Sequence, residues 1–277
     1  MKIDDIRSIA GKLDDISSES VFDNCRYCGN SHYSDRAIAE SVDICRTVIF
    51  PGYYRDSALS DRARESFIHR KIARLCNLLM REIGDEAVVD GFVSRLPEIR
   101  HFLAKDVEAT FNGDPAATSY DEVISCYPGI RAICNYRIAH ELFKLGVPLI
   151  PRMISEMAHR ETGIDIHPGA VIGESFTIDH GTGVVIGATS VIGNNVKIYQ
   201  GVTLGAKSFP LDPDGKPIKG IPRHPVIGND VIIYSNATIL GRILVGDGAV
   251  IGANIWITED VPPGSLIANR TKDQRSL

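Results

Sequence analysis

Two stretches of the sequence decide the fold. Residues 166–204 read IHPGAVIGESFTIDHGTGVVIGATSVIGNNVKIYQGVTL, and residues 227–257 read IGNDVIIYSNATILGRILVGDGAVIGANIWI. In both stretches an aliphatic residue returns every six positions, apart from a two-residue insertion within 179–185. Neither the 3.6-residue period of an α-helix nor the two-residue alternation of a strand produces this register. A six-residue repeat is typical of a stacked β-helix.

The residues around each repeated position support this interpretation. Most of the aliphatic positions are followed by glycine, and a small or β-branched residue usually stands two positions before them. We expect each aliphatic side chain to fill the interior of a coil and each small residue to turn a corner. With three hexapeptides per coil, the two stretches predict roughly four coils of a triangular prism. The repeated positions are Ile166, Ile172, Ile178, Ile186, Ile192, Ile198, Leu204, Ile227, Ile233, Ile239, Val245, Ile251 and Ile257.

A polar insertion separates the two stretches. Residues 207–225 read KSFPLDPDGKPIKGIPRHP and contain five prolines and four lysine or arginine residues. Proline and glycine at this density break a repeating backbone, so we expect an excursion loop over 207–223. The loop ends at Arg223-His224, which places it to cover a site on the wall of the β-helix. A tolerated surface insertion is the alternative.

The residues before the repeats have the period of α-helices. In residues 61–83 the apolar side chains recur at steps of four, three and four, and Gly84 is placed as a C-cap. Prolines open three further expected helices, over 97–113, 128–145 and 148–160.

These patterns predict an α+β chain of three parts. An α-helical N-terminal domain over residues 1–163 is followed by a parallel β-helix of hexapeptide repeats over 164–264. A short tail covers residues 265–277.

Composition and charge exclude several classes of function. The formal net charge of −5 over 277 residues gives no basic footprint for nucleic acid. No run of about 18 apolar residues is present, as a membrane span would need. The N-terminal MKIDDIRSIAGKLDDISS is acidic and lacks the apolar core of a signal peptide. We therefore expect a cytoplasmic protein with neither a nucleic-acid nor a membrane partner.

The six cysteines all lie in the first half of the chain. Cys25 and Cys28 form a CxxC pair, and only His32 stands near them, whereas structural zinc normally needs four ligands. We expect reduced thiols and no metal. A metal or redox site at Cys25 and Cys28 is the alternative.

Three polar motifs interrupt the aliphatic repeats and are the candidates for chemistry. They are DIHP at 165–168, DHGTG at 179–183 and RHP at 223–225. The first two lie about one coil apart, so stacking is expected to bring Asp165 close to His180. An imidazole with a carboxylate behind one nitrogen is a general base, because the carboxylate fixes the tautomer and stabilises the imidazolium.

These motifs, with three others, resemble those of serine O-acetyltransferases, the enzymes that open cysteine biosynthesis in bacteria and plants. The likeness covers roughly residues 112–264 and implies a left-handed β-helix, which sequence alone does not predict because it breaks the usual right-handed crossover rule. It also implies acetyl-CoA as co-substrate. The segments that carry it are GDPA at 113–116, YRIAH at 136–140, DIHPGA at 165–170, DHGTG at 179–183, QGVTLG at 200–205 and RHP at 223–225.

The resemblance implies a role for each matching polar residue. His180 would deprotonate the serine hydroxyl that attacks the acetyl-CoA thioester, and Asp165 would orient His180. The remaining residues would bind the acceptor, Asp114 and Asp179 at its ammonium group and Arg223 and His224 at its carboxylate. A zwitterion needs anions at one end and a guanidinium or imidazolium at the other.

The co-substrate and the assembly are also implied. CoA would lie along the β-helix wall near Gly205, Ala206, Ser235 and Ala253, where small residues allow the pantetheine arm close to the backbone. The wall would be shared between subunits of a homotrimer or a dimer of trimers. His167 and His140 are interpreted differently, as a turn residue and as a packing or hydrogen-bonding group.

Three departures from the family pattern bear on these implications. The 207–222 loop is longer than in the shorter enterobacterial-type enzymes, and Tyr234-Ser235-Asn236 replaces a stretch of small residues. The ending ANRTKDQRSL lacks the terminal isoleucine that docks O-acetylserine sulfhydrylase, which argues against that complex. The alternatives left open are a hexapeptide acetyltransferase acting on a sugar or another amino acid, a zinc carbonic anhydrase of the same fold, and a non-catalytic scaffold.

Overall fold

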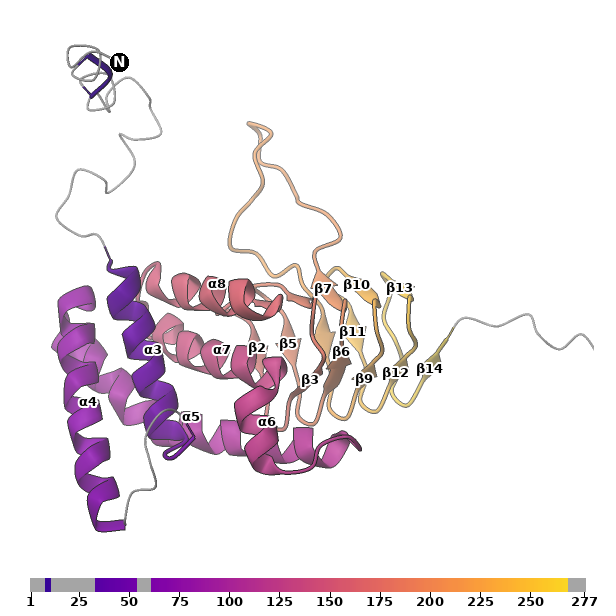
Figure 1. The fold of residues 1–277 in the computed structure, drawn as a ribbon. Helices are drawn as coiled ribbons and strands as arrows, with labels where there is room; N and C mark the ends of the chain where they lie inside the picture. Colours follow the sequence, from indigo (N-terminus) through magenta and orange to yellow (C-terminus); the bar gives the residue numbers. More distant parts are fainter. Residues whose placement is uncertain (1–7, 11–32, 54–60, 269–277) are drawn as a thin grey trace, which may run out of the picture. The chain divides into compact units, whose positions relative to one another are not determined.

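The computed structural model describes residues 8–10, 33–53 and 61–268. The chain divides into two units, residues 1–34 and 35–277, and the fold below is that of the second unit. Within it, helices come first and a solenoid of short strands follows (Figure 1). Cys25 and Cys28 lie outside the described residues, as do residues 269–277 of the C-terminal tail.

Six helices precede the solenoid in the described residues of this unit. The 28-residue α5 runs without interruption through Pro97, so the expected helix start at Pro97 is wrong. The helix begins eleven residues earlier, where the Asp85 side chain accepts a hydrogen bond from the Val88 N–H and caps it. The helices are α3 (Asp35–Ile49), α4 (Asp61–Ile83), α5 (Glu86–Gly113), α6 (Tyr120–Cys126), α7 (Pro128–Lys144) and α8 (Ile150–Thr162).

Of the other helix predictions, two are confirmed and one is wrong at its first residue. Helix α4 ends as expected, at a left-handed Gly84 whose N–H donates to the Met80 carbonyl. Helix α7 begins at Pro128, also as expected. Helix α8 begins at Ile150 rather than Pro148, because Leu149 adopts a φ of 60° and breaks the helical path. Helices α3 and α6 were not predicted.

The solenoid consists of fourteen strands of two or three residues, all paired in parallel. Sheet A contains β1, β4, β7, β10 and β13, sheet B contains β2, β5, β8 and β11, and sheet C contains β3, β6, β9, β12 and β14. The strands are β1 (Asp165–Ile166), β2 (Val171–Ile172), β3 (Thr177–Asp179), β4 (Val185–Ile186), β5 (Val191–Ile192), β6 (Lys197–Tyr199), β7 (Thr203–Gly205), β8 (Val226–Ile227), β9 (Ile232–Ile233), β10 (Thr238–Leu240), β11 (Leu244–Val245), β12 (Val250–Ile251), β13 (Trp256–Ile257) and β14 (Leu266–Ile267).

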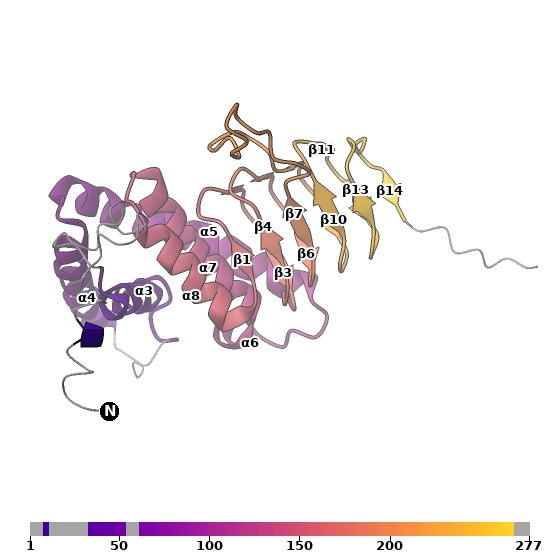
Figure 2. The same cartoon turned by 90° about the horizontal axis from the view of Figure 1, so that it is seen from above.

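The interior of this prism is built as the repeats predict. All thirteen repeated aliphatic positions are buried, and stacked pairs such as Ile192 and Ile227 stand in register. The coils number about five rather than four, because β14 pairs with β12 beyond residue 264. The loop between β7 and β8 projects from the coils as an excursion (Figure 1), and Figure 2 shows it from above, on the edge where sheet A turns into sheet B.

Helix α7 closes the first coil of the β-helix. Some backbone N–H groups of each coil donate to carbonyls of the next coil, as Val171 N–H does to Ser190 O and Gly173 N–H to Ile192 O. The matching carbonyls of the first coil, those of Ala170 and Ile172, have no preceding coil to receive from. Side chains of α7 supply the donors. Tyr136 donates to Ala170 O at 2.7 Å, His140 Nδ1 to Pro168 O at 2.8 Å, and Arg137 to Gly173 O at 2.8 Å. The expectation that His140 forms an intramolecular hydrogen bond is confirmed.

A buried ion pair completes this end cap. Both Asp106 oxygens accept from the Arg137 guanidinium, at 2.6 and 2.9 Å, and one also accepts from the Phe176 N–H at 2.9 Å. Asp106 is fully buried and Arg137 nearly so. The pair therefore joins α5, α7 and the first coil through charged groups that have no access to water.

No helix in the described part of the chain is long and apolar enough to cross a membrane. The cysteines that the structure describes, Cys45, Cys76, Cys126 and Cys134, are free thiols.

Candidate active site

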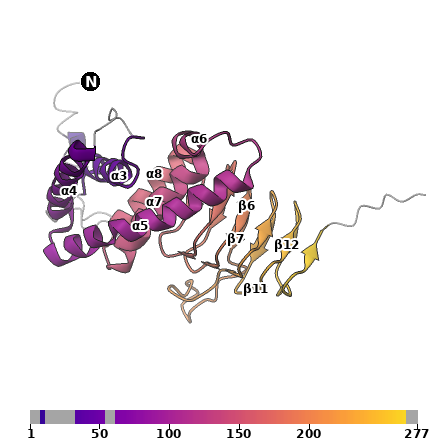
Figure 3. The same ribbon diagram turned by 90° about the horizontal axis from the view of Figure 1, so that it is seen from below.

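The first candidate cluster lies where the C-terminal end of α5 reaches the β-helix (Figure 3). Asp114 follows the last residue of α5, and its two oxygens accept from the Ala116 N–H at 2.8 Å and the Tyr127 hydroxyl at 2.6 Å. These hydrogen bonds, Tyr127 first, lower the pKa of Asp114 and keep it ionised. The same bond to Asp114 raises the pKa of Tyr127 to about 12.

Asp179 and Lys197 face Asp114 from the β-helix. Lys197 Nζ donates to the Gly113 carbonyl at 2.8 Å and lies 3.6 Å from Asp179 Oδ2. One small pocket is lined by Asp114, Tyr127, Asp179 and Lys197 together. Two carboxylates and one ammonium leave this pocket with a net negative charge, which suits a small cationic group.

His180 follows Asp179 at the corner where sheet C turns into sheet A, called here the CA corner. Its φ of 56° is left-handed, as at Asn236 and Asn254 at the same corner of later coils. The side chain is 75% exposed, and its Nδ1 lies 3.7 Å from Asp179 Oδ1. The turn therefore presents an accessible imidazole beside the anionic pocket.

The second candidate cluster lies at the corner where sheet A turns into sheet B, the AB corner. His224, at the end of the excursion loop, is buried, and its ring lies directly over Gly187, where any side chain would collide with it. Its Nδ1 accepts from the Thr189 N–H at 3.1 Å. Burial, together with the charges of Arg223 and Arg242 and with His167, lowers the pKa of His224 to about 4. His224 is therefore a neutral imidazole at pH 7, so the guanidinium of Arg223 rather than an imidazolium is the cation for an acceptor carboxylate.

Arg223 supplies the positive charge of this cluster. Its guanidinium lies 5.7 Å from the ring centroid of Phe209 in the excursion loop. The Nε atom is buried and has no hydrogen-bond partner among the described residues. A buried guanidinium donor without an acceptor suits an incoming carboxylate.

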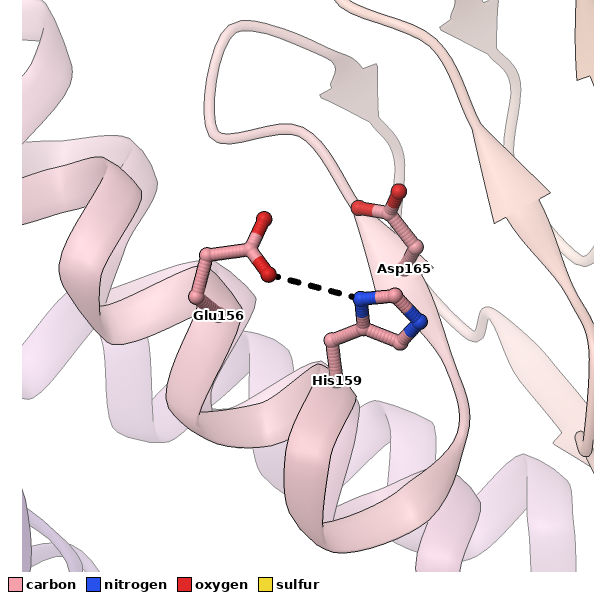
Figure 4. A group of neighbouring side chains, drawn as sticks. All are labelled: Glu156, His159 and Asp165. Carbon is pink, nitrogen blue, oxygen red and sulfur yellow. Dashed lines mark hydrogen bonds and ion pairs between the residues drawn. The ribbon is translucent and has the colours of Figure 1, made fainter.

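Asp165 belongs to this second neighbourhood. Its Oδ1 lies 3.7 Å from the Arg152 guanidinium, and Figure 4 shows its carboxylate beside Glu156 and His159 of α8. Arg152 also forms an ion pair with Glu156, so its positive charge stands between the two carboxylates. No hydrogen bond or ion pair joins Asp165 to His180 among the described residues. The expected pairing of these two side chains within one chain is therefore not found.

His167 adjoins the same neighbourhood as a turn residue. Its Nδ1 accepts from the Gly169 N–H at 3.0 Å, in keeping with the expected turn. Burial lowers its pKa, Arg152 and Arg223 lower it further, and Asp165 opposes them. These mutual influences place Asp165, His167, Arg223 and His224 together.

The predicted site is thus divided between two corners of the prism. Asp114, Asp179 and His180 gather at the CA corner, whereas Arg223 and His224 gather at the AB corner. The proposed CoA residues divide in the same way, because Gly205 ends a sheet A strand and Ala206 follows it, whereas Ser235 and Ala253 lie on CA turns.

Three residues of these clusters escaped prediction. Tyr127, Thr189 and Lys197 hold Asp114, His224 and Asp179 respectively. Lys197 occupies an outward repeat position where a lysine is unremarkable, and Tyr127 lies outside the quoted motifs. Of the three, only Thr189 has a sequence feature that could have predicted it, because it is a polar residue at a corner of the repeats.

Comparisons with known proteins identify relatives of this chain. A family model described as bacterial transferase hexapeptide (six repeats) matches residues 224–254. The plasmid serine acetyltransferase of Synechococcus elongatus is 50% identical over 246 residues, which cover 80% of this chain and 77% of that protein. The serine acetyltransferase of Bacillus subtilis is 49% identical over 165 residues, or 60% of this chain and 72% of that protein.

Solved structures show the same likeness. Serine acetyltransferase 1 of Entamoeba histolytica, in complex with L-cysteine, superposes with a TM-score of 0.75 at 38% identity, covering 83% of this chain and 86% of that one. Soybean serine acetyltransferase complexed with serine gives a TM-score of 0.59 at 30% identity, covering 94% and 93%.

Proposed function

Because this chain belongs to the serine acetyltransferase family and transfers acetyl groups to the serine hydroxyl, we propose how its residues divide that work. His180 is the general base, acetyl-CoA is the donor, and the acceptor is held between the two corner clusters. The observation that carries this proposal is the division of the site: an anionic pocket beside an accessible histidine, and a cationic cluster at the next corner.

The reaction transfers one proton from the serine hydroxyl to His180 and then from His180 to the CoA thiolate. His180 takes the proton of the serine hydroxyl as its oxygen attacks the thioester carbonyl of acetyl-CoA. The tetrahedral intermediate then collapses, the carbon–sulfur bond breaks, and the CoA thiolate receives the proton from the imidazolium. An exposed imidazole next to Asp179 suits this exchange, because the carboxylate stabilises the imidazolium that forms between the two steps.

The acceptor is recognised at both ends. Asp114 and Asp179 bind the serine ammonium in the pocket whose net charge is negative. Arg223 binds the carboxylate with its charge, and His224 adds a neutral N–H donor. A sugar acceptor has no use for this pair of opposite charges, which disfavours the sugar acetyltransferase alternative.

The two clusters meet when a second copy is present. In a trimer, the AB corner of one copy stands against the CA corner of its neighbour, so each active site takes residues from two chains. Asp165 then orients the His180 of the neighbouring copy, which accounts for their separation within one chain. CoA occupies the same groove, along Gly205 and Ala206 of one copy and Ser235 and Ala253 of the other.

The free thiols support a proposal about the compartment. The enzyme works in the cytoplasm, and this location is supported by the free Cys45, Cys76, Cys126 and Cys134 of the described chain, which suit a reducing environment.

A complementation experiment tests the shared site. Chains carrying His180→Ala and chains carrying Arg223→Ala are each expected to be nearly inactive. When the two are co-expressed and assemble at random, about a quarter of the interfaces combine two intact halves, so about a quarter of wild-type activity should return. Two controls, each variant co-expressed with itself, should recover nothing. A mixture that stays inactive while sedimenting as mixed trimers would place both halves in one chain.

The ammonium pocket gives a second prediction. Asp114→Ala is expected to raise the serine KM by roughly tenfold or more, because it removes an ionised partner of the ammonium group. The acetyl-CoA KM should stay within about twofold, since Asp114 does not face the thioester. Asp90→Ala, an exposed aspartate on the same helix, is the matched control. An unchanged serine KM in the Asp114 variant would show that the acceptor is not bound as an amino acid there.

A further inference from the structure

Thr189 connects the second coil of the β-helix to the end of the excursion loop. It stands on the AB corner between β4 and β5. Its hydroxyl oxygen accepts from the backbone N–H groups of Arg223 and His224, at 2.9 and 3.2 Å, and lies 2.8 Å from His224 Nδ1. Its own N–H donates to the same Nδ1 at 3.1 Å. One threonine therefore contacts both residues of the proposed carboxylate site.

These contacts determine where the Thr189 hydroxyl hydrogen points and which ring nitrogen of His224 carries the proton. A backbone N–H can only donate, so Nδ1 of His224 must offer a lone pair. The Thr189 oxygen already accepts twice, and a hydroxyl has one donor and two acceptor sites, so its hydrogen points to Nδ1 as well and shares the single Nδ1 lone pair with the Thr189 N–H. The His224 ring proton therefore sits on Nε2, and the imidazole is neutral.

The surroundings reinforce the same state. Arg242 donates to the Thr189 carbonyl at 2.7 Å and to the His224 carbonyl at 3.1 Å, which holds the corner closed. The charged and titratable groups facing His224 are Arg223, Arg242 and His167, and none of them favours an imidazolium. A proton on Nδ1 would also point at the Thr189 N–H and hydroxyl hydrogens, both of which are directed at that nitrogen.

We propose that Thr189 is the positioning residue that fixes His224 as a neutral Nε2–H donor and aligns it with Arg223 for the acceptor carboxylate. This rests on the proposed function. The carboxylate then meets the Arg223 guanidinium and one neutral donor, while Arg242 is engaged with the Thr189 and His224 carbonyls. Binding at this end consequently does not change as ordinary histidines titrate between about pH 5.5 and 8.

The kinetic test uses an isosteric pair of substitutions. Thr189→Val removes the hydroxyl and leaves the Arg223 and His224 N–H groups unpaired, so the serine KM is expected to rise roughly tenfold. The acetyl-CoA KM and kcat should stay within about twofold. Thr189→Ser keeps the hydroxyl and should restore the serine KM. Thr47→Val is the matched control, because Thr47 is also buried and its hydroxyl bonds only a backbone carbonyl of its own helix.

A ligand without a carboxylate separates positioning from general damage. Serinol keeps the ammonium group and the hydroxyl of serine but lacks the carboxylate. Its inhibition constant should be equal in wild type and Thr189→Val. An equal loss for serine and serinol, an unchanged serine KM in Thr189→Val, or a failure of Thr189→Ser to restore it would each overturn the proposal.

A spectroscopic readout does not depend on turnover. In protein labelled with ¹⁵N-histidine, His224 should keep a bare Nδ1 and a protonated Nε2 from pH 5.5 to 8. Thr189→Val should weaken this preference and let the signal titrate. A wild-type His224 that titrates near pH 6.5 would refute the tautomer assignment even if the enzyme acetylates serine, and a fixed tautomer in a protein without that activity would instead count against the proposed function.

Discussion

Replacing His180 by alanine is expected to lower kcat by at least about a hundredfold. The substitution removes the group that takes the serine proton, and general-base catalysis typically contributes a factor of that size or more. Substrate binding should change little, because the two KM values depend on the pockets beside His180 rather than on the imidazole itself. Steady-state release of CoA thiol, measured with saturating serine and acetyl-CoA, gives the result directly.

Two further variants make this measurement specific. His159→Ala removes another partly exposed histidine, one that pairs with Glu156, and should retain near-normal turnover. Asp165→Asn should lower kcat by less than His180→Ala, as expected for a residue that orients the base. Near-normal turnover in the His180 variant would mean that another group accepts the proton.

Replacing Arg137 by methionine is expected to destabilise the fold by about 3–5 kcal/mol. The change leaves Asp106 fully buried without its counter-charge, and a buried charge without a partner costs that much. It also removes the donors to the carbonyls of Ile172 and Gly173 in the first coil. Denaturant unfolding followed by circular dichroism measures the loss.

Further variants separate the effect of losing a charge from the effect of the burial of its partner. Arg95→Met breaks a partly exposed pair with Glu141 and should cost no more than about 1 kcal/mol. If Arg137→Met does not accumulate as folded protein, Arg137→Lys keeps the charge and allows the measurement. The double variant Asp106→Leu with Arg137→Met should recover part of the lost stability, because no unpaired charge remains. A single variant as stable as wild type would show that the pair contributes nothing.

Sequence patterns predicted the interior of the β-helix better than the site on its surface. The interior depends on a period, and a period is visible in one chain: every repeated aliphatic residue is buried. The expected contact of Asp165 and His180 depended on counting coils alone. Asp165 begins a sheet A strand and lies beside α8, whereas His180 stands on a CA turn. Counting repeats predicts the coil in which a residue lies, but it does not predict which side chains of other elements, such as Arg152 of α8, lie beside it.

The helices illustrate the same limit. Pro97 was interpreted as a helix start because proline is favoured there, yet the surrounding side chains Phe92, Leu96 and Ile99 are buried on both sides of it. Packing along the whole length of α5 outweighs the single backbone hydrogen bond that proline removes. The α7 residues of the YRIAH motif could be matched to a family, but their hydrogen bonds to the first coil are visible only in three dimensions.

The end cap on the first coil gives the β-helix a direction of growth. Each coil of a solenoid pairs with its neighbours, and the first coil has no preceding coil to pair with. Here α7 plays that part, since Tyr136 and Arg137 donate to Ala170 O and Ile172 O, the carbonyls that would otherwise accept from a preceding coil. The helices also leave the ribosome before any strand does. The nascent chain therefore meets a finished template at the moment the first repeat emerges, and winding can proceed from that seed toward the C-terminus.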